Sequence, residues 1–228
     1  MNPLLMPIIA IQGKRLRPAI EMLSPATGPE SGTVGDASRS PVRIAVLGES
    51  TAAGYGVDTH DEGFPGCLAH EIVARTSRPV SWEVVGQHAA TARRIRHRLL
   101  PRLGSDLDVV VVLAGASDVL VRRTPQEWGE DLSAIVDELA ARANQVLVAG
   151  IPPFRSFPSI PTLLGRYLAA GADALDTRSR QVCAERPRAT WVAAMDISSP
   201  DFFARDRFHP SASGYRRWAQ GVADHVTI

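Results

Sequence analysis

Residues 108–114, DVVVVLA, are the part of the sequence that says most about the fold. Four consecutive valines are followed by leucine and alanine, and Gly115 ends the run. β-branched residues favour extended structure, and an apolar run without polar alternation indicates a strand buried on both faces. Such strands are typical of parallel sheets that are covered by helices on both sides.

Segments of the same kind lie on both sides of this strand and alternate with amphipathic helical patterns. The predicted strands are 42–47, 81–86, 145–150 and 189–194, and the predicted helices are 64–76, 91–100, 125–142, 163–184 and 211–226. This alternation predicts a three-layer α/β/α sandwich with a parallel sheet of about five strands. Because ligands bind at the carboxyl ends of the strands in such sheets, the loops after the strands are where a site is expected.

The chain before the first of these strands divides into two parts. Residues 25–41, PATGPESGTVGDASRSP, are rich in Gly, Pro, Ser and Thr and have few large apolar side chains, which predicts a linker. The linker separates an N-terminal segment, residues 1–24, from the main domain, residues 42–228.

The N-terminal segment begins with an apolar run, MNPLLMPIIA, at residues 1–10. Its basic residues, Lys14, Arg15 and Arg17, follow the run, whereas in a secretory signal they precede it. The run is also too short to span a bilayer. We favour a segment docked on the domain, and peripheral membrane contact through residues 1–17 stays open as the alternative.

Composition excludes several classes of protein. The formal net charge is +1, so no overall field attracts nucleic acid. Cys67 and Cys183 are too few for a disulfide framework and lack metal-ligand spacing, which favours buried thiols in a cytoplasmic protein and leaves a single bridge open. The sequence has neither a Gly-x-x-x-x-Gly-Lys phosphate loop nor a His-Glu-x-x-His zinc motif, so no cofactor or metal is expected.

Three loops after predicted strands carry reactive side chains. Residues 48–54, GESTAAG, present the hydroxyl of Ser50 beside free backbone N–H groups, although Ser50 could equally cap the next helix. Asp206 precedes His209 by three residues, a spacing that lets the carboxylate fix the tautomer of an imidazole that accepts a proton from serine. Residues 115–118, GASD, follow the strongest strand and belong either to the same site or to a capped turn.

Taken in order, these loops resemble the sequence blocks of the SGNH (GDSL-type) hydrolase superfamily, which includes esterases and lipases. The matching stretches are LGESTAAGYGV (47–57), VVGQHAATA (84–92), LAGASDV (113–119) and DRFHPSASGY (206–215). The resemblance covers residues 42–226 and implies a flavodoxin-like sheet. It also implies that Ser50 is the nucleophile, that His209 is its base, and that Asp206 orients His209.

The resemblance further implies an oxyanion hole built from the backbone N–H groups of Ser50 and Ala89 and the side chain of Ser117. The sequence departs from the family pattern at three positions, with Glu49 in place of Asp, Ala89 in place of Gly and Ser117 in place of Asn. A serine hydroxyl is shorter than an asparagine amide, and losing one oxyanion donor typically costs about 10²–10³ in rate. We therefore expect activity that is reduced rather than absent.

These observations predict a hydrolase that cleaves a small carboxylic ester, acyl or acetyl, through an acyl-enzyme on Ser50. Two alternatives remain, a degenerate protein of this fold that only binds its ligand, and an acyltransferase or deacetylase using the same residues. The proline-rich residues 152–161 carry Phe154 and Phe157, which form either the wall of an acyl pocket or a cover for the sheet.

Overall fold

The computed structural model describes residues 3–19, 22–36, 38–199 and 201–228. Its sheet has six strands in the order β1-β3-β2-β4-β5-β6. They are β1 (Ser31–Val34), β2 (Val42–Gly48), β3 (Val80–Gly86), β4 (Leu107–Leu113), β5 (Ala143–Ala149) and β6 (Ala189–Val192). Strands β2 to β6 are parallel to one another, whereas β1 pairs antiparallel with β3.

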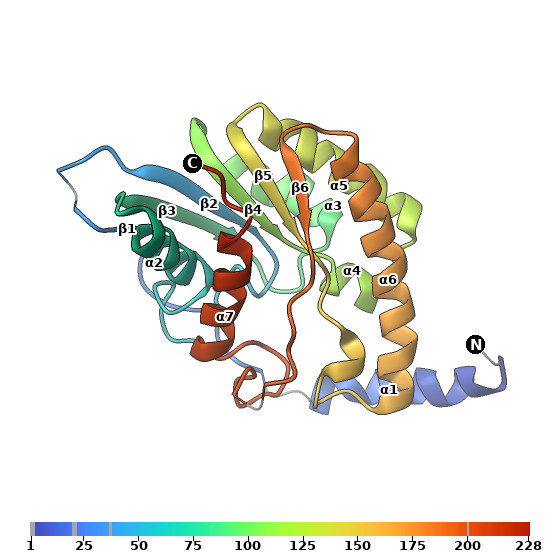
Figure 1. The fold of residues 1–228 in the computed structure, drawn as a ribbon. Coiled ribbons are helices and arrows are strands. Elements are labelled where there is room, and N and C mark those ends of the chain that lie inside the picture. Colours follow the sequence, from blue (N-terminus) through green and yellow to red (C-terminus); the bar gives the residue numbers. More distant parts are fainter. Residues whose placement is uncertain (1–2, 20–21, 37, 200) are drawn as a thin grey trace.

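Helices cover both faces of the sheet (Figure 1). They are α1 (Met6–Ala19), α2 (Phe64–Thr76), α3 (Ala92–Arg94), α4 (Ala116–Leu120), α5 (Pro125–Ala140), α6 (Thr162–Ala184) and α7 (Ala212–Ala223). Shorter turns of helix lie at Pro3–Leu5, Ile95–Leu99, Leu100–Arg102 and Phe154–Ser156. The predicted helix at 91–100 is therefore present as a short α-helix that continues as a π-helical turn.

Alternate residues of β2 pack on opposite faces of the sheet. Ile44 and Val46 belong to the core beneath α2 and α7, and Ala45 and Leu47 belong to the core shared with α5 and α6. The predicted three-layer α/β fold is confirmed, and its parallel strands follow the flavodoxin-like order.

The strand that the sequence analysis did not predict, β1, lies inside residues 25–41, which were predicted to be a linker. Ser31–Val34 pairs with β3 from Val34 opposite Val80 to Ser31 opposite Glu83. Gly32 is required there because a Cβ atom would lie 2.7 Å from the ring of Trp82. An edge strand needs no continuous apolar run, since one of its edges and part of its surface face water.

Helix α1 docks against α6, as the favoured interpretation of the N-terminal segment expects. Ile9 and Leu16 are buried in the core that includes α5 and α6, and the side chain of Gln12 accepts a hydrogen bond of 3.2 Å from the Leu164 N–H. Among the described residues no helix is long and apolar enough to cross a membrane. Residues 1 and 2 of the proposed membrane-contacting segment lie outside the described part of the chain.

The two cysteines are buried and unpaired. Cys67 belongs to the core beneath α2, and Cys183 belongs to the core on the opposite face of the sheet, which excludes the bridge that the sequence left open. Burial raises the pKa of each thiol to about 11, so both stay protonated at neutral pH.

Candidate active site

Strands β2, β3 and β4 end at the same level, and the loops with the reactive side chains meet at their carboxyl ends. Gly48, Gly86 and Leu113 lie at the same level in the register of β2, β3 and β4. A Cβ atom on Gly48 would lie 2.1 Å from the Leu113 carbonyl oxygen, and one on Gly86 would lie 2.4 Å from the Ala53 nitrogen. The two glycines therefore let the loop that carries Ser50 settle directly onto the ends of the strands.

The structure brings Ser50, His209 and Asp206 together in a buried chain of hydrogen bonds. His209 Nε2 lies 3.0 Å from Ser50 Oγ, and His209 Nδ1 lies 2.6 Å from Asp206 Oδ2. The second carboxylate oxygen, Asp206 Oδ1, accepts the backbone N–H groups of Phe208 at 2.9 Å and His209 at 3.0 Å. The turn between the two residues has Arg207 in the left-handed region at φ 57°.

The surroundings of Asp206 keep its carboxylate ionised. Burial raises its pKa, but the hydrogen bonds from the His209 ring and from the Phe208 and His209 N–H groups outweigh burial and lower it overall. An ionised Asp206 holds the Nδ1 proton of His209, which leaves Nε2 free to accept the proton of Ser50.

The backbone N–H groups of Ser50 and Ala89 are the donors that the sequence analysis predicts for an oxyanion hole. Among the described residues, neither the Ser50 N–H nor the Ala89 N–H has a hydrogen-bond acceptor. Both residues line the same cavity, together with Ser117. Ala89 has φ 52°, so the loop does need the left-handed conformation that the family's glycine adopts at no steric cost.

Ser117 contacts Glu49, a pairing that the sequence analysis missed. The carboxyl group of Glu49 accepts the N–H groups of Ala116 at 3.0 Å and Ser117 at 2.8 Å, and one of its oxygens forms a short hydrogen bond with Ser117 Oγ. Burial raises the pKa of Glu49 to about 7. The only signal in the sequence was that both positions depart from the family pattern.

A second buried carboxyl group, that of Asp118, connects α4 to the loop that carries Ala89. Asp118 Oδ2 accepts the Ala92 N–H at 2.9 Å, which fixes the loop that carries Ala89 against α4. Burial raises the pKa of Asp118 to about 6. Through Glu49 and Asp118, α4 is therefore connected to both of the loops that supply backbone donors.

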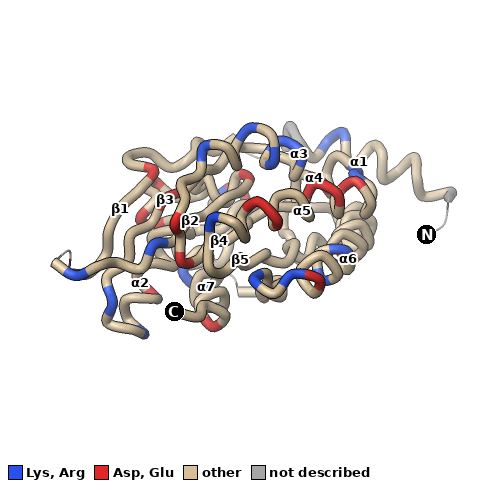
Figure 2. Tube along the Cα trace, turned by 90° about the horizontal axis from the view of Figure 1, so that it is seen from above, with Lys and Arg blue, Asp and Glu red and all other residues tan. Residues whose placement is uncertain are grey.

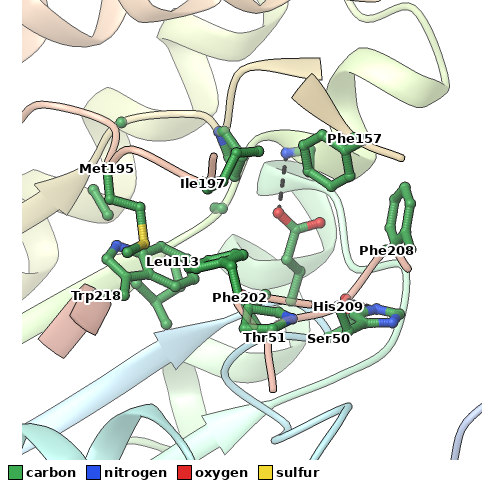
Figure 3. A pocket seen from close by; sticks show the side chains of 17 residues that line it. Ser50, Thr51, Leu113, Phe157, Met195, Ile197, Phe202, Phe208, His209 and Trp218 are labelled. Atoms are coloured by element: carbon green, nitrogen blue, oxygen red, sulfur yellow. Dashed lines mark hydrogen bonds between the residues drawn. The ribbon is translucent and has the colours of Figure 1, made fainter. Parts of the chain in front are cut away.

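Two cavities flank Ser50 and His209. The smaller has a volume of about 40 Å³ and an apolar lining (Figure 3). In that view Met195 and Trp218 lie on the side of the cavity away from His209. Its apolar walls include Leu113, Phe157, Met195, Ile197, Phe202, Phe208 and Trp218.

The larger cavity has a volume of about 380 Å³ and a mixed lining. Its polar side includes Tyr55, His88, Arg122 and Tyr167, and the Tyr55 ring stacks on His88 with centroids 4.9 Å apart. Ser50, His209 and Phe208 line both cavities.

The two phenylalanines singled out in the proline-rich segment have different surroundings. Phe157 lines the smaller cavity, whereas Phe154 is fully buried behind it, with ring centroids 5.4 Å apart. Sequence reasoning missed the remaining apolar walls, because they come from separate segments and carry no motif.

Comparisons with known proteins identify the family of the chain. The GDSL-like Lipase/Acylhydrolase family matches residues 46–217. The chain is 26% identical over 184 residues to the GDSL-like esterase Rv1075c of Mycobacterium tuberculosis, an alignment that covers 76% of this chain and 58% of that protein. The chain thus spans less than two thirds of the length of this relative.

Solved structures support the fold. An extracellular lipase from Streptomyces rimosus superposes with a TM-score of 0.60 at 16% identity, covering 82% of this chain and 100% of the lipase. Est24, a carbohydrate acetylesterase from Sinorhizobium meliloti, superposes with a TM-score of 0.61 at 20% identity, covering 81% and 97% of the two chains. Since the family match includes the loops of Ser50, Ala89, Ser117 and His209, the chain belongs to the GDSL-like lipase/acylhydrolase family.

Proposed function

We propose that the protein hydrolyses carboxylic esters through an acyl-enzyme formed on Ser50. The observation that carries this proposal is the hydrogen-bonded series Ser50–His209–Asp206, with 3.0 Å between Ser50 Oγ and His209 Nε2. A serine hydroxyl becomes a useful nucleophile only when such a base removes its proton.

The reaction proceeds in two acyl transfers. His209 takes the proton of Ser50 as Oγ attacks the ester carbonyl, and the resulting oxyanion accepts hydrogen bonds from the Ser50 and Ala89 N–H groups. His209 then gives the proton to the departing alkoxide, which leaves as an alcohol. Water attacks the acyl-enzyme in the same way, with His209 as base, and releases the carboxylic acid and free Ser50.

We place the acyl chain in the smaller cavity and the alcohol in the larger one. A group the size of a water molecule needs about 10–15 Å³ of such space, so a cavity of about 40 Å³ holds roughly three or four heavy atoms. This volume fits an acyl chain of about two to four carbons. The larger cavity combines a mainly apolar lining with the polar groups of Tyr55, His88, Arg122 and Tyr167, which suits an alcohol with both apolar and polar parts.

Chain-length preference tests this placement. We expect kcat/KM for p-nitrophenyl acetate or butyrate to exceed that for the octanoate by at least about fivefold, because overfilling a packed site costs about 1–3 kcal/mol. Phe157→Ala should move the optimum toward longer chains, whereas Leu120→Ala, which alters only the larger cavity, should leave it unchanged. A preference for octanoate, or a shift with Leu120→Ala alone, would place the acyl chain on the other side.

The two alternatives are separated by product analysis. A protein of this fold that only binds would give the same background rate as its Ser50→Ala variant. An acyltransferase would form a transferred ester when alcohol or sugar acceptors are added, at the expense of free acid. Ester hydrolysis predicts Ser50-dependent release of acid with no transferred product.

We also propose that α1 contacts an anionic membrane surface. Ile8 and Ile11 lie on one side of α1 and are 47% and 51% exposed, and Leu4 in the turn before the helix is 81% exposed. Lys14 and Arg15 are exposed, and within the described part of the chain neither forms an ion pair. Figure 2 shows basic and no acidic residues along α1, whose N-terminal half extends beyond α6 in both overall views. An apolar face beside unpaired basic charge is typical of interfacial helices.

Vesicle sedimentation tests this contact. We expect the protein to bind phosphatidylcholine vesicles that contain phosphatidylglycerol, and the double variant Ile8→Glu/Ile11→Glu to bind about tenfold or more weakly, because two apolar side chains are lost from the buried face. Ile228→Glu, which changes another exposed apolar residue, should bind like the wild type. Equal sedimentation of the wild type and the double variant would contradict the proposal.

A further inference from the structure

The hydrogen bond between Glu49 and Ser117 can run in either direction. Two of the partners of the Glu49 carboxyl group are the N–H groups of Ala116 and Ser117, which can only donate. The third partner, Ser117 Oγ, can donate or accept. The protonation state of Glu49 therefore determines what the hydroxyl proton of Ser117 does.

The two protonation states of Glu49 leave different hydrogen-bond donors in the larger cavity. An ionised Glu49 can only accept, so the Ser117 hydroxyl donates to it and is not available to a substrate. A protonated Glu49 donates to Ser117 Oγ instead, and the hydroxyl proton is released toward other acceptors. Ser117 lines the same cavity as Ser50 and Ala89, whose N–H groups are the free backbone donors.

We propose that Glu49 is a positioning residue that, in its protonated form, turns the hydroxyl of Ser117 into the third donor of the oxyanion hole. The proposal rests on the proposed ester hydrolysis and adds a proton-dependent element to it. No covalent bond changes in this step. A single proton resides on Glu49, and the Ser117 hydroxyl rotates toward the oxyanion.

The surroundings of Glu49 make its protonated form accessible near neutral pH. Its carboxyl group is buried, and no cationic side chain is hydrogen-bonded to it among the described residues. Burial raises its pKa to about 7, and the neighbouring Asp118 on α4 also raises it. Arg123, 3.9 Å from Asp118, lies behind that carboxyl group. Glu49 lines both cavities. The other titratable or charged side chains in their linings are Tyr55, His88, Arg122, Tyr167 and His209.

The two sequence departures also compensate each other in size. Relative to the pattern that the chain resembles, position 49 gains a methylene group and position 117 loses the reach of an amide. The longer Glu49 side chain extends to the shortened Ser117 and meets its hydroxyl. The pair therefore leaves a hydroxyl at the position of the family's asparagine, in the lining of the cavity that Ser50 and Ala89 also border.

The test compares the wild type with Ser117→Ala in kcat/KM between pH 5.5 and 9.5. Effects of pH on the parts of the site that the two proteins share cancel in the ratio of their rates. We expect the wild type to be about 10- to 100-fold faster below pH 6, because it has one more oxyanion donor. As Glu49 loses its proton, the ratio should fall through a midpoint near pH 7 toward one above pH 8.

Two further variants test the role of Glu49 even if Ser117→Ala folds poorly. Ser117→Asn carries a permanent amide donor, so its rate relative to Ser117→Ala should not change with pH. Glu49→Gln cannot ionise, and the decline of the wild-type rate at alkaline pH should be absent from its profile. Thermal melting of each variant checks its folding.

The possible outcomes separate this inference from the proposed function. If activity depends on Ser50 but the ratio of kcat/KM between the wild type and Ser117→Ala stays flat or rises with pH, the inference about Glu49 is wrong. The proposed hydrolysis would be unaffected by that result. Wild-type activity equal to that of Ser50→Ala would instead overturn the proposed hydrolysis.

Discussion

Replacing Ser50 with alanine is expected to lower kcat for p-nitrophenyl acetate by about 10⁴-fold or more. The hydroxyl lies 3.0 Å from His209 Nε2 and is the group that forms the acyl-enzyme in the proposed mechanism. Without it, water must attack the ester directly, with help only from the Ala89 and Ser50 N–H groups. The residual rate should therefore not show a burst of p-nitrophenol.

The matched control is Ser213→Ala. Ser213 is a hydroxyl of the same kind near the site, but it is hydrogen-bonded to Asp201 and not to His209. We expect its kcat to stay within a factor of a few of the wild type. Similar losses in both variants would indicate a disturbed fold rather than a missing nucleophile.

Asp206→Asn should lower kcat by about 10⁴-fold, as the corresponding change does in serine proteases. The amide keeps the size of the side chain, but its nitrogen can donate to His209 Nδ1. The imidazole would then carry its proton on Nε2, where it can no longer accept the proton of Ser50. Thermal stability and kcat are the quantities to measure.

Asp201→Asn provides the comparison for this change. Asp201 is an exposed carboxylate in the same segment that is bonded to Ser199, Ser213 and Arg217 and has no contact with the imidazole. Its loss should leave kcat nearly unchanged. If Asp206→Asn were equally harmless, His209 could not depend on Asp206 for its tautomer.

The parallel strands were predictable because their signal is local. Val109–Leu113 of β4 is continuously buried between the two helical layers, so each of these residues must be apolar, and Ile44–Leu47 of β2 and Val146–Ala149 of β5 follow the same rule. Helix α5 begins at Pro125, the first residue of the predicted helix 125–142, and Thr124 before it forms a capping box with Glu127. Edge strand β1 has no such signal, since backbone pairing with β3 and the space above Trp82 stabilise it.

The contacts of the site were predictable only where they join residues that are close in the sequence. Asp206 and His209 lie in one turn, so their contact follows from local spacing. The contact of Glu49 with Ser117 joins positions 68 residues apart and depends on how β2 and β4 pair. The apolar cavity is likewise assembled from distant segments, and only Phe157 could be suspected from its position after a strand.

The pairing of Glu49 with Ser117 changes how the departures from the family pattern are interpreted. Considered separately, Ser117 removes an oxyanion donor and Glu49 only lengthens a carboxylate side chain. Considered together, they replace a permanent amide donor with a hydroxyl donor that depends on a proton. Ala89 has no comparable compensation, because its φ of 52° is adopted by a residue with a Cβ atom.

Covalent labelling with a fluorophosphonate, read by intact-protein and peptide mass spectrometry, tests most directly whether Ser50 is an activated nucleophile. The reagent reacts with serine hydroxyls that a neighbouring base has activated. We predict one adduct per chain, located on Ser50, absent from Ser50→Ala and formed far more slowly by Asp206→Asn. No adduct on the folded wild type, or an adduct on a different residue that persists in Ser50→Ala, would contradict the assignment of Ser50, His209 and Asp206 as the catalytic group.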